Sequence, residues 1–204
     1  MDNAAESLTS YHHGDLRHAL VEAGVTLLQA EGIGAITLRK VAGRAKVSHA
    51  APYRHFADKQ ALLIAIAEQG FQKLTVTMQA AVNQYTDNPR QQLLAIGEHY
   101  MQFGIAHPAH LTLMFGEMLQ QEDDVLHEVA RASFDVLLNA VTRAQQAGIL
   151  KAGDSRQMAT SMWSMVHGLT VLKGSRLAEQ GGGELKEYVE GMLEQLLEGL
   201  ATSS

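Results

Sequence analysis

The residues with the clearest capacity for chemistry lie between Thr37 and Lys59, where cations, hydroxyls and imidazoles gather. Six lysines and arginines stand in this stretch against one acid, Asp58. Guanidinium and ammonium groups bind phosphate oxygens, while hydroxyl and imidazole groups can form hydrogen bonds with phosphates or base edges. The stretch is therefore a candidate nucleic-acid interface, and its candidate contacts are Thr37, Lys46, Ser48, His49, Ala50, Tyr53, Arg54, His55 and Lys59.

Two short helices joined by a tight turn are expected to hold these side chains, over about residues 37–56. Apolar residues recur at helical spacing in the first helix, and Ser48 can cap a second helix that continues to Phe56. A helix-turn-helix of this kind places its exposed second helix in the major groove of DNA. Pro52 crowds the carbonyl four residues earlier, so the second helix is expected to open with a distorted turn of 3-10 type.

The side chains of the second helix divide into two expected roles. The predicted phosphate contacts are Ser48, Tyr53, His55 and Lys59. The residues predicted to lie nearest base edges are His49, Ala50 and Arg54. The alternative at this point is an ordinary helical hairpin with a solvated charged face, because helix-turn-helix patterns are short.

Several motifs in this region resemble a known signature. Val47-Ser48, Tyr53, His55-Phe56 and Lys59-Gln60-Ala61-Leu62 resemble the recognition-helix signature of TetR-type one-component transcriptional regulators, and the run from Tyr11 to Arg17 resembles the opening of their first helix. The resemblance implies a DNA-binding domain over residues 11–74. Lys46 stands where the family usually has glycine, so the turn either keeps a negative φ or carries left-handed strain.

The remainder of the chain, residues 75–204, predicts a larger helical body. No strand alternation, phosphate loop or dinucleotide fingerprint appears, so the fold is expected to be all-α with about nine helices. The first helix is expected from Asp15, after a mobile tail over residues 1–10. The later helices are expected at about 59–85, 89–106, 109–119, 122–147, 155–178 and 185–200.

A second resemblance concerns this body. The segment Trp163-Ser164-Met165-Val166-His167-Gly168 is similar to the Trp…His-Gly motif of one C-terminal domain type among TetR-like regulators. It implies a domain that binds a ligand and forms a homodimer through its last two helices. The apolar stripe from Leu185 to Leu200 independently favours such pairing, because it presents more apolar surface than one small body buries alone.

Methionines and aromatic residues in the body are candidates to line an effector site. Thioethers are flexible and polarizable, so they adapt to varied apolar shapes. The candidates are Met101, Phe103, Met114, Phe115, Met118, Phe134, Met162, Trp163, Met165 and His167. His99, Tyr100 and His167 could orient the polar end of a hydrophobic or amphipathic ligand. The alternative is a plain core that uses methionine to fill gaps.

Composition limits the function classes. The chain of 204 residues contains no cysteine, which agrees with a reducing compartment and excludes thiol chemistry. Its net charge is −6, but residues 1–60 hold seven lysines and arginines against six acids. The excess negative charge therefore lies in the rest of the chain. No segment resembles a membrane span or signal peptide, so a cytoplasmic protein is expected. No arrangement of nucleophile, base and orienting residue suggests an enzyme, and no metal or cofactor is expected.

We therefore expect a ligand-responsive transcriptional regulator. The predicted activity is that of a repressor, which binds a pseudo-palindromic operator in double-stranded DNA as a homodimer and is released by a small-molecule effector. The alternative function is a helical protein-interaction module that does not bind DNA.

Overall fold

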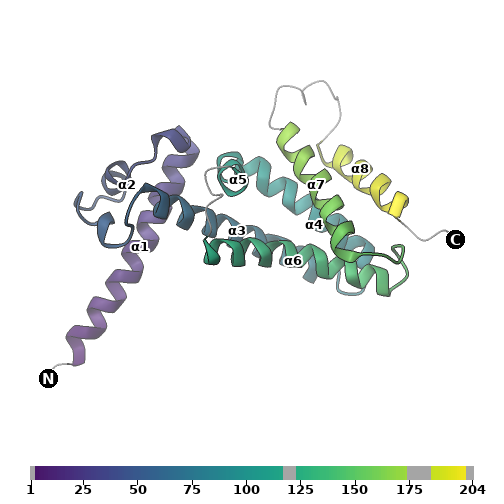
Figure 1. Cartoon of the computed structure of the whole chain (residues 1–204), viewed down its shortest axis with the longest axis horizontal. Helices are drawn as coiled ribbons and strands as arrows, with labels where there is room; N and C mark the ends of the chain where they lie inside the picture. The colour runs from purple at the N-terminus through teal and green to yellow at the C-terminus, as the bar shows by residue number, and fades with distance from the viewer. Residues whose placement is uncertain (1–2, 117–122, 174–184, 201–204) are drawn as a thin grey trace. The chain divides into compact units, whose positions relative to one another are not determined.

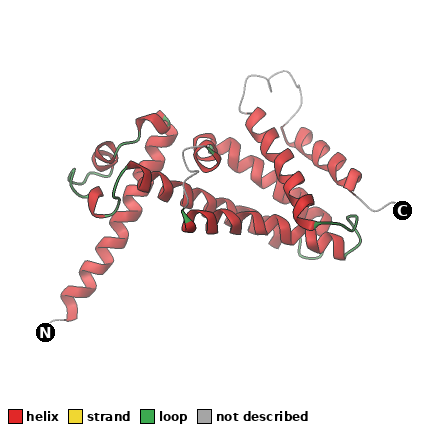
Figure 2. Ribbon diagram, in the orientation of Figure 1, coloured by secondary structure: helices red, strands yellow, loops and turns green. Residues whose placement is uncertain are grey.

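The computed structural model describes the backbone of residues 3–116, 123–173 and 185–200, with most side chains from Leu16 onward. Over these residues the secondary structure consists of α-helices and two 3-10 helices, with no strand (Figure 2). Eight α-helices are described, one fewer than expected. The missing one is the second helix of the predicted helix-turn-helix. The all-α prediction is confirmed.

The chain divides into two compact units. The first contains the residues up to Gly70 together with α5 (Pro108–Phe115) from Ala109 onward, and the second runs from Phe71 to Pro108 and resumes at Asp123. The boundary between Gly70 and Phe71 falls inside α3 (Lys59–Gln84), so one helix contributes residues to both units (Figure 1).

The first unit is built on α1 (Asn3–Glu31), which packs against η1 (Ile33–Ala35) and α2 (Leu38–Arg44). Its core is apolar, with Leu20, Leu28, Ile36, Val41 and Ile66 each at most 1% exposed. Gln69 of α3 donates a hydrogen bond of 2.7 Å to Glu22 of α1. Burial of the apolar faces, with polar groups paired at their edges, holds α1 against α2 and α3.

The start of α1 differs from the prediction. The helix begins at Asn3, whereas a tail over residues 1–10 and a helix start at Asp15 were expected. Alanine, glutamate and leucine at positions 4–8 are good helix formers, so intrahelical hydrogen bonds can continue the helix beyond its apolar stripe.

The second unit is organised around α4 (Pro89–Ala106), which packs against α6 (Asp124–Gln146), α7 (Ser155–Lys173) and α8 (Leu185–Leu200). All six residues from Gln92 to Gly97 are buried, because neighbouring helices cover α4 on several sides. Gln92 satisfies its buried amide by donating to the Val82 carbonyl at 3.2 Å and accepting from the Arg143 guanidinium.

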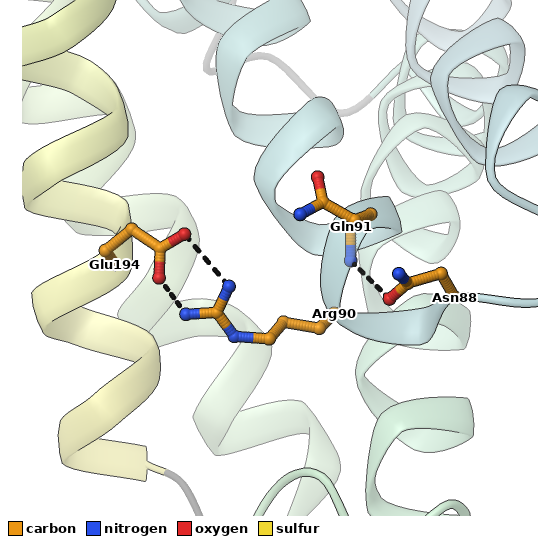
Figure 3. A network of polar contacts seen from close by, with 4 residues as sticks. All are labelled: Asn88, Arg90, Gln91 and Glu194. Atoms are coloured by element: carbon orange, nitrogen blue, oxygen red, sulfur yellow. Dashed lines mark hydrogen bonds and ion pairs between the residues drawn. The ribbon is translucent and has the colours of Figure 1, made fainter.

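Two helix starts in this unit are set by side-chain caps. The side chain of Asn88 accepts a hydrogen bond of 3.1 Å from the Gln91 backbone N–H and so caps α4 (Figure 3). Pro89, the next residue, occupies the first helical position. Asp123 caps α6 in the same way through the Leu126 N–H at 2.8 Å. The predicted start at Pro89 is confirmed, and α6 begins at Asp124, two residues after the predicted start at residue 122. The expected ends of the helices at Leu119 and Ala178 lie outside the described residues.

An ion pair joins the first turn of α4 to α8. The Arg90 guanidinium lies against both carboxylate oxygens of Glu194, and the Nη1 to Oε1 distance is 2.9 Å (Figure 3). The two side chains are 37% and 36% exposed, so solvent weakens the pair to about 1 kcal/mol or less. Its bidentate geometry nevertheless specifies how α8 lies on α4, because a guanidinium fork matches a carboxylate in few orientations.

Candidate nucleic-acid interface and effector site

The first part of the candidate interface is α2 and the turn that follows it. Thr37 caps α2 by accepting a hydrogen bond from the Lys40 N–H at 3.1 Å. Lys46 then adopts φ 57°, the single described non-glycine residue with positive φ. Of the two turn conformations predicted for Lys46, the structure has the left-handed one. The turn is closed by a hydrogen bond from the Val47 N–H to the Ala42 carbonyl at 3.0 Å.

The predicted α-helix from Ser48 to Phe56 is wrong in type. Residues 49–51 form turns, and only Pro52–Arg54 is helical, as a 3-10 helix. Pro52 has no N–H to donate and its ring excludes the preceding helical turn, so hydrogen bonds run three residues back, as from Ala51 N–H to the Ser48 carbonyl at 3.0 Å. The Ser48 cap is also wrong, because Ala51 precedes the 3-10 helix with no side-chain cap.

The distorted segment still presents most of the candidate side chains to solvent. Thr37, Lys46, Ser48, His49, Ala50, Tyr53 and Arg54 are exposed, and His55 and Lys59 are half-buried. Tyr53 is 62% exposed, which is unusual for a large aromatic side chain. Pro52 and Phe56 of the same segment are buried, so these two residues hold the segment in place while its polar residues remain accessible.

Three cations of the first unit have partners within it. The Lys59 ammonium lies 3.4 Å from the Ile33 carbonyl, and the Lys40 ammonium lies 2.9 Å from Glu31. The Arg17 guanidinium lies over the Phe56 ring, with 5.5 Å from its Cζ to the ring centroid, and 3.8 Å from Glu68. Ammonium groups have three donors, so Lys40 and Lys59 retain donors for phosphate oxygens.

The candidate effector residues do not form one group. Met101, Phe103 and Met162 are buried in the second unit, where Phe134, Trp163, Met165 and His167 are half-buried. Met114 is buried and Phe115 is 36% exposed in the first unit. Met118 lies outside the described residues.

A polar and aromatic cluster does form within the second unit. The Tyr100 hydroxyl lies 2.7 Å from Nδ1 of His167. The Trp163 ring stands 5.7 Å from the His167 ring and 6.4 Å from the Phe134 ring, between centroids. His99, the third polar candidate, instead contacts the Ala95 carbonyl of its own helix at 2.8 Å. Sequence patterns alone could not show the Tyr100 to His167 contact, because it joins separate helices.

Burial shifts the titration of this cluster. It raises the pKa of Tyr100 well above the ordinary value, and a hydrogen bond with the Trp163 side chain works against that rise. Burial also lowers the pKa of His167 below 6.5. Both effects disfavour charge, so the pair is a neutral phenol and a neutral imidazole near neutral pH. Such a pair can exchange hydrogen bonds with a ligand but supplies no formal charge.

Among the described residues, no group of three or more histidines and acids is placed to hold a metal ion. No helix within the described ranges is both long and apolar enough to cross a membrane.

An all-helical chain with a short helix, a tight turn and an exposed basic segment defines a helix-turn-helix DNA-binding protein. Comparisons with known families agree. A model described as bacterial regulatory proteins of the tetR family matches residues 20–66, and one described as a tetracyclin repressor-like C-terminal domain matches residues 93–196. This chain belongs to the TetR family of transcription regulators. The Trp-His-Gly type of its C-terminal domain stays a prediction.

Individual relatives span most of the chain. A protein of unknown function from Rhodococcus sp. RHA1 is 35% identical and has a TM-score of 0.85, covering 94% of this chain and 98% of that one. A TetR family transcription regulator from Marinobacter aquaeolei VT8 has the same fold, with 19% identity and a TM-score of 0.72 over 95% and 100% of the two chains. Nucleoid occlusion factor SlmA of Marinobacter nauticus is 26% identical over 137 residues, or 67% and 70% of the two lengths.

Proposed function

We propose that this DNA-binding regulator is a repressor that binds a pseudo-palindromic operator as a homodimer and is released by a small apolar or amphipathic effector. The observation that carries the DNA-binding part is the exposed basic segment between Thr37 and Lys59 in an otherwise acidic chain. Cations on one surface neutralise phosphates, while the acidic remainder weakens adhesion elsewhere. The site of action is then the cytoplasm, where a bacterial regulator meets its operator.

Dimerisation is assigned to α7 and α8. Val171 and Leu172 near the end of α7 are 54% and 53% exposed, which is costly for adjacent apolar side chains in a monomer. A two-fold axis through these helices would present two copies of the DNA-binding unit to two half-sites, and operator symmetry would match protein symmetry.

Effector binding is assigned to the second unit, at its half-buried aromatic residues beside Tyr100 and His167. Adaptable Met101 and Met162 lie buried in the same unit. The effector would change the relation between the two DNA-binding units of the dimer and lower operator affinity, by a coupling energy of about 1–3 kcal/mol. The alternative for the methionines is gap filling in a plain core.

The operator test is retention of genomic fragments by the purified protein, followed by binding of the selected duplex at several salt concentrations. We expect log affinity to fall steeply and linearly with log salt, because bound phosphates release counterions. An affinity with no salt dependence, or no selected duplex, would instead favour the protein-interaction module.

The dimer test uses Leu196→Glu in α8, a half-buried position. We expect sedimentation to show a dimer for the wild type and a monomer with weak operator affinity for this variant. Val125→Glu is the control, because Val125 is 57% exposed on α6 and outside the assigned interface. A monomeric wild type at about micromolar concentration contradicts the assignment.

A further inference from the structure

Beyond the neutral Tyr100 and His167 pair, the second unit carries a row of stacked groups on one side of α7. Arg156, Trp163 and His167 are separated by seven and four residues, so they lie along one helical face. Phe134 from α6 and Tyr100 from α4 complete the row. The order is Arg156, Phe134, Trp163, His167, Tyr100.

The distances show that each group touches the next. The Arg156 Cζ lies 5.6 Å from the Phe134 centroid, and Phe134 meets Trp163 edge to face at 82° between planes. Trp163 is tilted by 43° to His167, which reaches Tyr100 by a hydrogen bond of 2.7 Å. The row is therefore a continuous aromatic surface with a cation at one end and neutral hydrogen-bonding groups at the other.

Solvent exposure increases along the row from Tyr100 to Arg156. Tyr100 is buried, Phe134, Trp163 and His167 are half-buried, and Arg156 is exposed. Aromatic side chains of this size usually lie deeper when they serve only the core, because they carry a large apolar area. A ligand could cover the exposed parts of Phe134 and Trp163 without displacing the buried network behind them.

Arg156 supplies the charge that selects the ligand. Within the described part of the chain, Arg156 enters no ion pair, while arginines 17 and 90 each face a glutamate. Oδ1 of the neighbouring acid Asp154 accepts the backbone N–H groups of Arg156 and Gln157 and thereby caps α7. The guanidinium fork is thus available to a carboxylate, which it binds in a bidentate manner.

We propose that this row binds an aromatic carboxylate, with the ring of the ligand against Phe134 and Trp163 and its carboxylate on Arg156. The assignment rests on the proposed effector function and gives the chemical class of that effector. The anion complements the one exposed cation of the row, and the aromatic ring of the ligand complements the two half-buried rings.

The test exploits Trp163, the one tryptophan of the chain. Hydrocinnamate is titrated into the full-length protein, with indole emission excited at wavelengths where the ligand is transparent. Two matched probes, hydrocinnamamide and cyclohexanepropionate, remove the charge and the aromaticity in turn. We expect hydrocinnamate to change the emission at saturation and to bind about tenfold more tightly than either matched probe.

Substitutions of Arg156 test whether its guanidinium binds the carboxylate of the ligand. Arg156→Gln is expected to bind hydrocinnamate and hydrocinnamamide equally, and Arg156→Lys to recover part of the preference for the acid. Lys73→Gln, which removes one charge from α3 in the same unit, should leave that preference unchanged. Equal affinity of the wild type for acid and amide, or an unchanged preference in Arg156→Gln, overturns the proposal.

Operator release is measured separately, by adding hydrocinnamate to the protein and duplex complex. Binding with the expected preference but without release supports the site and contradicts the ligand-released repressor. Operator binding by a protein that shows no emission change and no calorimetric heat with hydrocinnamate overturns the site and leaves DNA regulation intact.

Discussion

The hydroxyl of Tyr100 lies 2.7 Å from Nδ1 of His167, and this part-buried contact joins α4 to α7 within the second unit. Burial keeps both groups neutral, so Nδ1 of His167 can accept a hydrogen bond from the Tyr100 hydroxyl. Protonation of His167 would remove that acceptor. The pair therefore links the packing of α7 against α4 to pH.

The first prediction concerns pH. The folded state holds the pKa of His167 below 6.5, its ordinary value in the unfolded chain, so the unfolded state binds more protons as the solution is acidified. The contribution of His167 to stability is present above pH 6.5 and is lost as pH falls through the lowered pKa. Denaturant titrations of the wild type and His167→Gln should show a smaller pH dependence in the variant, and equal slopes would contradict this.

The second prediction concerns the strength of the same contact. Tyr100→Phe keeps the ring but leaves Nδ1 of the half-buried His167 without its phenolic partner, at a cost of about 0.5–1.5 kcal/mol in unfolding free energy. Tyr53→Phe is the control, because that hydroxyl is on an exposed residue of the first unit. If both variants unfold at the wild-type midpoint, the Tyr100 contact does not stabilise the fold.

The third prediction concerns the strained turn before the DNA-binding segment. Lys46→Gly should raise the unfolding free energy by about 1 kcal/mol, because glycine adopts φ 57° without a Cβ clash. Lys46→Ala removes the same charge but retains the Cβ, so it should not stabilise. Both variants should bind DNA more weakly if Lys46 contacts phosphate. Equal stability of the two variants would show that no strain is stored there.

The fourth prediction concerns the close approach of α1 and α3. A Cβ on Gly24 would lie 2.6 Å from Cδ1 of Ile66, so Gly24→Ala should cost about 1–3 kcal/mol. Ile66→Val removes that methyl and should recover part of the loss in the double variant. Gly43→Ala, with open space around it in α2, should gain about 0.5–1 kcal/mol. A neutral Gly24→Ala in thermal and denaturant unfolding contradicts the packing argument.

The fifth prediction separates phosphate contacts from base contacts. Tyr53→Ala should weaken binding to all duplexes about equally, whereas Arg54→Ala should lose about 1–3 kcal/mol at particular base pairs and relax the preference there. Fluorescence anisotropy with a set of singly substituted operators measures both effects. An Arg54→Ala protein with full affinity and unchanged base preference would show that Arg54 does not read bases.

Local chemistry in the sequence determined the fold class and most helix starts. Asn88 ahead of Pro89, and Asp123 before α6, cap their helices through hydrogen bonds that span three residues, so the local sequence contains the atoms that set these helix starts. The basic character of residues 37–59 was equally visible, because charge is a property of composition. Pro52 signalled a distortion for the same local reason, its missing N–H.

Tertiary structure alone decided how far that distortion goes and which distant side chains meet. Burial of Pro52 and Phe56 fixes a single 3-10 helix where the apolar pattern predicted an α-helix. The Tyr100 to His167 contact joins residues 67 positions apart, and Arg90 meets Glu194 across 104. Such pairs depend on the packing of whole helices against α4, and no local spacing in the sequence encodes it.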